Sequence, residues 1–154
     1  MAQGKEVTIK IISLTECTYS DWLSLWQGYL TFYQTALSET QAKLTWQRLR
    51  DENQPDMFGY AIQINDQIVG FVHLISHSST WTTLPYCYLQ DLFIDNHYRN
   101  QGLARKLIEH VYAVCADQFD RVYWLTHESN QNAQLLYDRI ASKTGFIQYK
   151  KALH

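Results

Sequence analysis

The sequence predicts a mixed α/β fold, in which helices cover a single β-sheet. Three observations support this prediction: short segments with apolar residues at every second position, longer segments with apolar residues at helical spacing, and the alternation of the two along the chain. Of the 154 residues, 46% are hydrophobic and 18% are charged, which is typical of a globular protein. We therefore expect one domain over residues 1–154 with its own hydrophobic core.

The N-terminal part predicts a strand and two helices. Residues 7–11 alternate apolar and polar side chains, as a half-buried strand does. Residues 18–33 begin with a threonine that can cap a helix and continue with apolar residues at helical spacing. A second helix, over about residues 38–50, begins with the capping sequence SETQ.

The middle and C-terminal parts predict five more strands and two more helices. Residues 58–64 and 67–76 flank Asn65 and Asp66, which tolerate the positive φ of a tight hairpin turn. The remaining predicted strands are residues 86–94, 121–126 and 146–150, and the remaining predicted helices are residues 101–117 and 130–142. The order strand, helix, strand over residues 86–126 predicts two neighbouring parallel strands joined by a crossover helix.

Charge and hydropathy argue against two classes of partner. The net charge is -2 and the pI is about 6.3, whereas a nucleic-acid-binding surface normally has a basic excess. No stretch approaches the roughly 18 apolar residues of a membrane span, and the N-terminal MAQGKEVTIK lacks the order of a signal peptide. We expect a cytoplasmic protein that binds neither nucleic acid nor membrane.

The cysteines and histidines predict neither a disulfide framework nor a metal site. Cys17, Cys87 and Cys115 are far apart and form no C-x-x-C pair. His73 and His77 lie in a segment typical of a strand, and the sequence contains no H-E-x-x-H motif. We predict reduced, mostly buried thiols and no bound metal.

A possible anion site follows the strand at residues 86–94. Arg99, Gly102 and Ala104 occur at the spacing R-x-x-G-x-A immediately before a helix. Glycine lets the backbone approach a ligand closely, and a helix N-terminus offers unpaired N–H groups and a positive dipole. These features suit a pyrophosphate, with Arg99 as an added cation. A purely structural interpretation, in which Gly102 only eases the turn into the helix, has about equal weight from this motif alone.

The order of these segments resembles the GNAT superfamily of N-acetyltransferases, in which the R/Q-x-x-G-x-G/A motif wraps the pyrophosphate of coenzyme A. The resemblance implies the acyl-CoA N-acyltransferase fold, with about six to seven strands and four helices, and acetyl-CoA as co-substrate. It also implies that the pantetheine arm lies along the backbone of one splayed strand. The implied cofactor-binding residues are Leu92, Phe93, Ile94, Arg99, Asn100, Gln101, Gly102, Leu103, Ala104, Arg105, Asn130 and Asn132.

Several longer segments resemble the histone and polyamine acetyltransferase branch of this superfamily. They include SDWLSLWQGYLTFY, YCYLQDLFI and RVYWLTHESNQNAQLLYDRIA. The branch implies a homodimer that acetylates a polyamine or a lysine-like amine by direct transfer in a ternary complex. The alternatives are acetylation of free amino acids or aminoglycoside-like amines, and a non-catalytic acyl-CoA-binding sensor.

By this resemblance Tyr137 is the general acid that protonates the departing thiolate. It ends the pattern N-x-x-A-x-x-x-Y formed with Asn130 and Ala133. Packing is a second interpretation, because Ala133, Tyr137 and Ile140 share a helical stripe. Relatives commonly have Gly-Phe four residues after this tyrosine, whereas here Gly145 follows Tyr137 by eight residues.

The general base is less clearly defined. Polyamine-type relatives have glutamate where this chain has Gln90, which cannot take a proton. Removal of the amine proton must then fall to Asp91, Glu128 or a water chain, unless the amine arrives neutral. Asp91 in a buried strand must have a partner, so a structural hydrogen bond is as plausible as catalysis. We expect Gln90 and Asp91 to line the acceptor channel.

Aromatic residues complete the predicted acceptor site. In relatives the first two helices and the loop before the splayed strand lie over the cleft, which makes Tyr29, Tyr33 and Trp81 candidate walls. Aromatic faces can also hold an ammonium group. Core or dimer packing is the alternative interpretation, particularly for Tyr33 and Trp81.

Overall fold

The computed structural model describes residues 6–154, and the chain divides into two compact units with the boundary after Trp124. The larger unit contains the sheet and three of the four α-helices, and the smaller unit contains the fourth. Each unit is described separately below. The expectation that the whole chain forms one domain stays a prediction.

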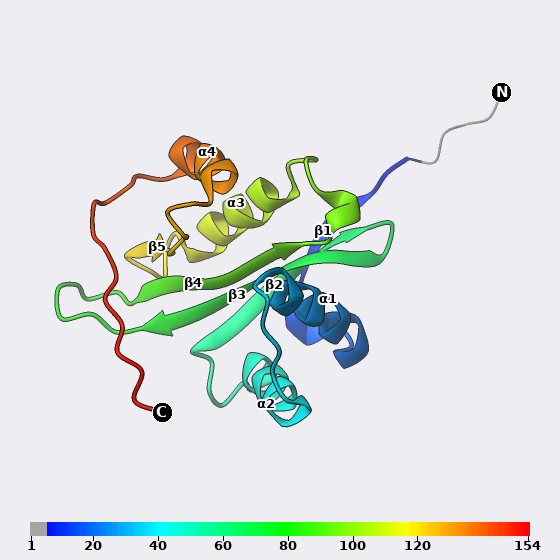
Figure 1. Cartoon of the computed structure of the whole chain (residues 1–154), viewed down its shortest axis with the longest axis horizontal. Coiled ribbons are helices and arrows are strands. Elements are labelled where there is room, and N and C mark those ends of the chain that lie inside the picture. The colour runs from blue at the N-terminus through cyan, green and yellow to red at the C-terminus, as the bar shows by residue number, and fades with distance from the viewer. Residues whose placement is uncertain (1–5) are drawn as a thin grey trace. The chain divides into compact units, whose positions relative to one another are not determined.

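The larger unit is built on a five-stranded sheet with the order β1-β2-β3-β4-β5 (Figure 1). The strands are β1 (Ile9–Ser13), β2 (Met57–Ile64), β3 (Gln67–His77), β4 (Tyr86–Ile94) and β5 (Arg121–Tyr123). The first four pair antiparallel, whereas β5 pairs parallel to β4 as the crossover predicted. The predicted hairpin is confirmed, with φ values of 50° at Asn65 and 69° at Asp66.

The helices begin at the predicted capping residues. The α-helices of this unit are α1 (Tyr19–Phe32), α2 (Glu39–Arg50) and α3 (Leu103–Cys115), with short 3-10 turns at Leu14–Glu16 and Asn96–Tyr98. The Thr18 side chain accepts a hydrogen bond from the backbone N–H of Asp21, and that of Ser38 accepts one from the N–H of Gln41. Each cap satisfies one N–H group that the helix itself leaves unpaired.

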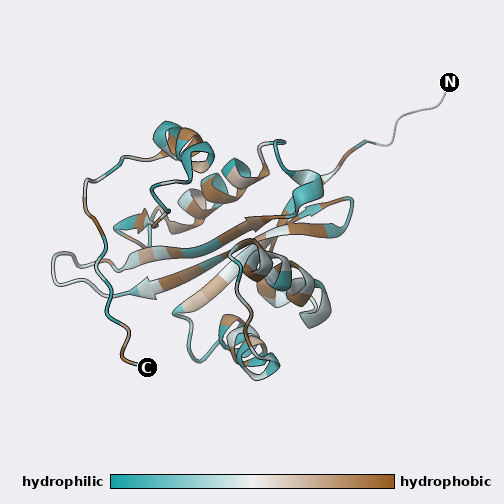
Figure 2. Ribbon diagram, viewed as in Figure 1, coloured by the Kyte–Doolittle hydropathy of each residue, from teal (hydrophilic) through white to brown (hydrophobic). Residues whose placement is uncertain are grey.

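Helices cover both faces of the sheet. Ala61, Phe71 and Phe93 lie opposite one another on β2, β3 and β4, and they pack into one core cluster with α1 and α2. Tyr60, one position from Ala61, points to the other face and contacts His110 of α3. Hydrophobic residues accordingly run along β3 and β4 between the two helical layers (Figure 2).

Helix α1 approaches β4 closely at a glycine. A Cβ atom on Gly28 would lie 3.1 Å from the ring of Phe93. Because Gly28 has no side chain, the following turn of α1, which carries Tyr29, lies directly against this strand. The three cysteines are buried and free, as expected.

The smaller unit contains helix α4 (Gln131–Ile140), and residues 141–154 form neither helix nor strand. The prediction of a strand at residues 146–150 was therefore wrong, and the sheet has five strands instead of six to seven. The local pattern of β-forming residues is present, but a strand also needs a neighbour to pair with. Phe146, Ile147 and Tyr149 are instead exposed. The predicted homodimer stays a prediction.

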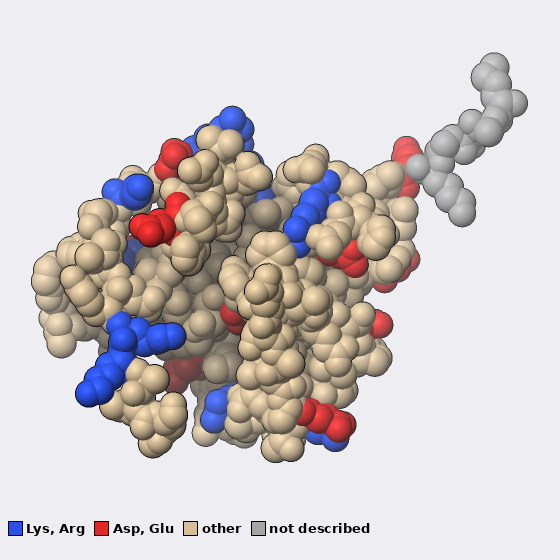
Figure 3. Space-filling model, viewed as in Figure 1, with Lys and Arg blue, Asp and Glu red and all other residues tan. Residues whose placement is uncertain are grey.

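Charged residues are dispersed over one face of the molecule. On the face drawn in Figure 3, the described Lys and Arg residues lie in separate groups among acidic and uncharged residues. Among residues 6–154, no helix is long and apolar enough to cross a membrane. The same residues include no group of three or more His, Cys, Asp or Glu side chains placed to hold a metal ion. The cytoplasmic location stays a prediction.

Candidate active site

The candidate site centres on a β-bulge in β4. His73 of β3 lies opposite Asp91, and the next residue, Leu74, lies opposite Leu89, so Gln90 is an extra residue in β4. Side chains normally alternate between faces, but a bulge shifts this alternation by one position. Gln90 and Asp91 therefore both lie on the face that α1 covers. Gln90 is exposed, whereas the Asp91 side chain is only 11% exposed.

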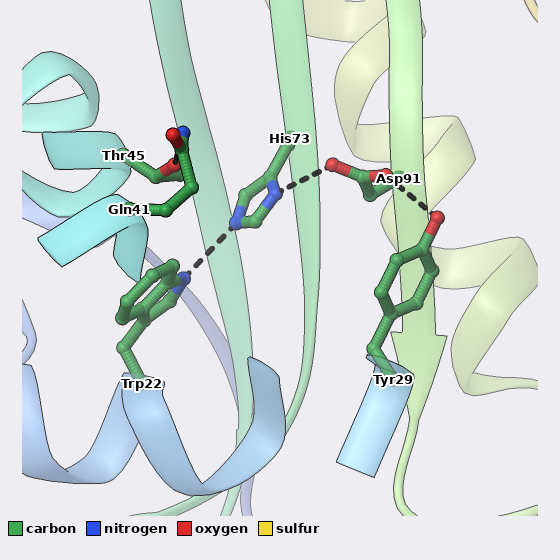
Figure 4. A network of polar contacts seen from close by, with 6 residues as sticks. All are labelled: Trp22, Tyr29, Gln41, Thr45, His73 and Asp91. Carbon is green, nitrogen blue, oxygen red and sulfur yellow. Dashed lines mark hydrogen bonds and ion pairs between the residues drawn. The ribbon is translucent and has the colours of Figure 1, made fainter. Parts of the chain in front are cut away.

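Two hydrogen-bond donors hold Asp91, the half-buried Tyr29 and the buried His73 (Figure 4). The Tyr29 hydroxyl on α1 donates to Oδ1 over 2.6 Å. The His73 Nδ1 atom on β3 lies 2.9 Å from Oδ2. The sequence predicted that an aspartate in a buried strand must have a partner, and Asp91 has two, on α1 and β3. One of them is Tyr29, which was predicted as a wall of the acceptor site.

Tyr29 remains a donor at all ordinary pH values. The pKa of Tyr29 is raised well above its usual range. Burial is the largest cause, and the negative charge of Asp91 and the hydrogen bond to Asp91 add to it. In the unfolded chain a tyrosine ionises at about pH 10, whereas in the folded protein the Tyr29 hydroxyl stays protonated at that pH. The stability that this contact contributes is therefore complete below about pH 10 and decreases as the pH rises further.

Beside the bulge, β4 has an open edge. Strand β5 pairs only with residues 86–88 of β4. Within the described chain, residues 89–94 have no strand partner on that side. The backbone of Leu92, Phe93 and Ile94, which was predicted to bind pantetheine, therefore lies on a stretch that does not pair with β5, although the Ile94 carbonyl accepts a hydrogen bond from Arg99 Nε. An extended, amide-containing ligand can pair with such an edge.

The predicted anion site lies at the N-terminus of α3. Gly102 is the N-cap residue with φ at +75°, a left-handed conformation that favours glycine, and no side chain caps the helix there. Asn100 also has a positive φ of 62°. The first N–H groups of α3 have no partner within the helix. They belong to the predicted segment of Gly102, Leu103, Ala104 and Arg105, in which the Leu103 side chain is buried and only its backbone can bind a ligand.

The two predicted arginines lie in different environments. The Arg99 guanidinium stacks over Phe32 at 5.1 Å and over Phe93 at 5.6 Å, and its Nε atom donates to the Ile94 carbonyl. The Arg105 Nε atom forms an exposed ion pair with Glu109 over 2.8 Å. Arg99 is therefore held on the face of the sheet that carries Asp91 and Phe93, whereas Arg105 lies at the surface. Gln101 is also exposed.

Four predicted site residues belong to the smaller unit. Tyr137 lies within α4 and is half-buried, and Asn130 is the N-cap residue of that helix. The Asn130 side chain makes no capping hydrogen bond, so capping does not explain this asparagine. Asn132 and Glu128 are exposed. The assignment of these four residues to the site stays a proposal.

The other predicted aromatic walls are exposed. Trp81, in the loop between β3 and β4, is 86% exposed. Tyr33 is 55% exposed and packs against Tyr29 with the ring centroids 4.9 Å apart. Of these residues, the structure places Tyr33 beside the Tyr29–Asp91 pair.

Sequence reasoning missed His73 and Trp22. Trp22 was assigned to the apolar stripe of a helix, and His73 was considered only as a metal ligand. His73 is 3% exposed, and it is the buried polar residue among the described residues. The available signal was a histidine within the apolar run VGFVHLI, where a buried imidazole requires hydrogen-bond partners.

Comparison with known proteins identifies the fold and the chemistry. The model of the Acetyltransferase (GNAT) family matches residues 19–141. The chain belongs to the GNAT family. It is 34% identical over 134 residues to the D-amino-acid N-acetyltransferase HPA3 of Saccharomyces cerevisiae, a match that covers 84% of this chain and 82% of that protein. Together these matches show that the protein is an acetyl-CoA-dependent N-acetyltransferase.

Solved GNAT structures share the fold at low sequence identity. The aminoglycoside N-acetyltransferase AAC(6')-Iy in complex with CoA has a TM-score of 0.79 at 12% identity, covering 100% of this chain and 99% of that chain. The ribosomal-protein-alanine N-acetyltransferase from Brucella melitensis biovar Abortus 2308 has a TM-score of 0.71 at 15% identity, with coverages of 96% and 100%. These comparisons support the GNAT superfamily but not its histone and polyamine branch, which the sequence segments had suggested.

The residues of the larger unit fit acetyl-CoA. An uncapped helix N-terminus behind a left-handed glycine suits the pyrophosphate, and a Cβ atom on Gly102 would meet no atom within 4 Å. The open edge of β4 suits the amides of the pantetheine arm. Both features lie on segments that the sequence had assigned to the cofactor.

Gly102→Ala is expected to raise the Kd for CoA about fivefold, corresponding to roughly 1 kcal/mol. A left-handed non-glycine residue costs about 1–2 kcal/mol, so the first turn relaxes and its N–H groups move away from the pyrophosphate. Isothermal titration calorimetry measures the change. Gly145→Ala is the matched control, because Gly145 has φ at +85° and is equally open, but it lies outside the proposed cofactor segment. Equal affinities in both variants would contradict the role of Gly102.

Proposed function

We propose that the acceptor is a small primary amine, of the free amino-acid class, that receives the acetyl group directly in a ternary complex. The observation that supports this most strongly is the half-buried Tyr29–Asp91 pair at the β4 bulge, beside the open edge of the same strand. A carboxylate that accepts from two donors still has acceptor sites for the N–H groups of an amine. In this proposal the amine binds next to the stretch of β4 that is proposed to bind pantetheine.

The proposed reaction joins the amine nitrogen to the acetyl carbon and breaks the bond between that carbon and the CoA sulfur. The amine loses one proton, and the departing thiolate gains one. A primary alkyl amine such as lysine has a pKa of about 10.4, so most of it reaches the enzyme protonated. We assign Asp91 to removal of this proton and Tyr137 to protonation of the thiolate.

The charges around Phe93 support an amino-acid acceptor. The Phe93 ring contacts Tyr29, whose hydroxyl bonds Asp91, and it also contacts the Arg99 guanidinium. The Asp91 carboxylate and the Arg99 guanidinium therefore lie against one ring pair, Asp91 at Tyr29 and Arg99 at Phe93. A free amino acid carries an ammonium group and a carboxylate on one carbon, which complements this arrangement. The D-amino-acid specificity in the name of the yeast relative favours the same class.

The acceptor class can be tested by measuring thiol release from acetyl-CoA with a panel of amines. The panel contains D- and L-amino acids, the corresponding amino-acid amides, polyamines, lysine peptides and aminoglycosides. We expect the highest kcat/KM with free amino acids and at least about tenfold lower values with their amides, because loss of the carboxylate removes a charge-assisted contact. A preference for polyamines or lysine peptides would overturn the amino-acid class and favour the first sequence-based expectation.

Arg99→Gln separates two possible roles of the arginine. If Arg99 binds the acceptor carboxylate, the variant loses the preference for amino acids over their amides and keeps its affinity for CoA. If Arg99 binds the pyrophosphate, as the motif predicts, the Kd for CoA rises and the preference remains. The second outcome would remove Arg99 from the proposed acceptor site.

A further inference from the structure

A buried histidine lies behind the proposed amine site without direct access to it. The His73 side chain is 4% exposed and stacks on Phe71 with the ring centroids 4.4 Å apart. Its two nitrogen atoms have different partners, which are Asp91 at Nδ1 and Trp22 at Nε2. Neither contact is required to pack an apolar core, so the pair calls for a functional explanation.

The Trp22 contact determines the protonation of the imidazole. The indole Nε1–H group of Trp22 lies 3.0 Å from His73 Nε2, and indole nitrogen can only donate. His73 Nε2 must therefore be an unprotonated acceptor, and the ring proton must be on Nδ1. This Nδ1–H group points at Asp91 Oδ2, which accepts it over 2.9 Å.

We propose that Trp22 and His73 are positioning residues for Asp91: Trp22 fixes the imidazole tautomer with its proton on Nδ1, and this N–H group holds the carboxylate in the orientation that suits the acceptor amine. The inference rests on the proposed role of Asp91 in amine binding and proton removal. It adds a chain of contacts, Trp22 to His73 to Asp91 to Tyr29, that crosses from α1 to the two central strands and returns to α1 (Figure 4).

The arrangement has two chemical consequences. Two donors occupy one lone pair on each Asp91 oxygen, and a carboxylate has about four such sites, so acceptor capacity remains for an ammonium group. Trp22 also blocks the nitrogen at which His73 would take up a second proton. Uptake of a proton at this nitrogen would therefore require the loss of the Trp22 hydrogen bond.

The other ionisable groups near His73 do not take over the role of Trp22 in fixing its tautomer. The groups that face the network are Asp91 and Tyr88 on β4 and Tyr29 and Tyr33 on α1. Helix α2 contributes the Trp46 ring, which stacks on Trp22, with the Arg50 guanidinium above Trp46. On β2 the residue opposite His73 is Gly59, and on β3 its ring neighbour is Phe71. Asp91 is the carboxylate in this set.

The chain offers a matched pair of tryptophan variants. Trp22 and Trp26 lie on the same helix, are both buried and stack with their centroids 5.7 Å apart. The Trp26 Nε1 atom, however, has no hydrogen-bond partner among the described residues. Trp22→Phe and Trp26→Phe therefore make the same change of side chain in one cluster, but only Trp22→Phe removes the donor to His73.

In Trp22→Phe we expect kcat/KM for the acceptor to fall about tenfold at neutral pH, with an unchanged Kd for CoA. The released Nε2 atom can then bind a proton, with a reference pKa of about 6.5. The slope of log kcat/KM against pH should therefore become steeper by about one below about pH 6.5. Trp26→Phe should stay within about twofold of the wild type and keep its slope. Identical behaviour of the two variants would overturn the inference.

Nuclear magnetic resonance tests the network without turnover. In the wild-type protein, the ¹⁵N shifts of His73 at neutral pH should show a protonated Nδ1 and an unprotonated Nε2. The carboxyl ¹³C shift of Asp91 should change in Trp22→Phe but not in Trp26→Phe. A proton on Nε2, or an unchanged Asp91 signal, would overturn the inference, whereas absence of turnover with these signals present would overturn only the proposed function.

Substitutions of His73 distinguish positioning from simple packing. Asparagine has both an N–H donor for Asp91 and a carbonyl acceptor for Trp22, whereas leucine has neither. We expect His73→Asn to keep at least about threefold more of the wild-type kcat/KM than His73→Leu, although leucine suits an apolar core better. The reverse order would show that His73 only fills space.

Discussion

Asp91→Asn should lower kcat/KM for the amine about a hundredfold, within the range of general acid–base catalysis. The amide cannot take the amine proton, and it removes the negative charge that faces the ammonium group. Asparagine keeps only one acceptor oxygen, whereas Asp91 accepts from both the Tyr29 hydroxyl and His73 Nδ1. The substitution therefore keeps at most one of these two contacts in its present direction, in addition to removing the charge.

The measurement is the pH dependence of kcat/KM together with the Kd for CoA, which should not change. Asp117→Asn is the matched control, because Asp117 is exposed just after α3. Circular dichroism and thermal unfolding establish that the variant is folded. Unchanged pH dependence and an unchanged KM for the amine in Asp91→Asn would exclude Asp91 from the acceptor channel.

Tyr137→Phe should lower kcat at least about tenfold while the protein remains folded. The substitution removes only the hydroxyl that is proposed to protonate the thiolate, and the ring continues to pack in α4. Because the loss concerns the departing thiolate, kcat should fall with every acceptor in the panel. The KM values for the amine and for acetyl-CoA should change much less.

The control for this variant is Tyr149→Phe, which removes a hydroxyl from the same unit at a residue that is 90% exposed. The decisive measurement is kcat at saturating acetyl-CoA, compared between thiol release and formation of the acetylated amine. If Tyr137→Phe turns over as fast as the wild type, the packing interpretation of Tyr137 is correct and another group donates the proton.

Much of the fold was readable from the sequence, because it depends on residues a few positions apart. Thr18 and Ser38 cap the helices that they were predicted to begin, and Asn65 and Asp66 form the predicted hairpin turn. The helix that follows the R-x-x-G-x-A motif was also predicted, although the left-handed φ of Gly102 was not. In each case the backbone conformation or the cap is set by one residue and its near neighbours.

The proposed amine site was readable only in part. Asp91 and Tyr29 were each predicted, but their contact joins residues 62 positions apart, and the contact of Trp22 with His73 joins residues 51 positions apart. Sequence spacing does not give the register between two strands. The extra residue Gln90 shifts the face on which Asp91 lies, and only the paired strands reveal that shift.

The sequence by itself determined the class of this protein and the local elements that can bind acetyl-CoA, because motifs and periodicity are properties of contiguous residues. Tertiary structure decided that the segment at residues 146–150 is not a strand, since strand formation depends on a pairing partner elsewhere in the chain. It also decided which side chains hold Asp91. That choice depends on the docking of α1 against β3 and β4, where hydrogen-bond partners are selected by distance in space and by burial.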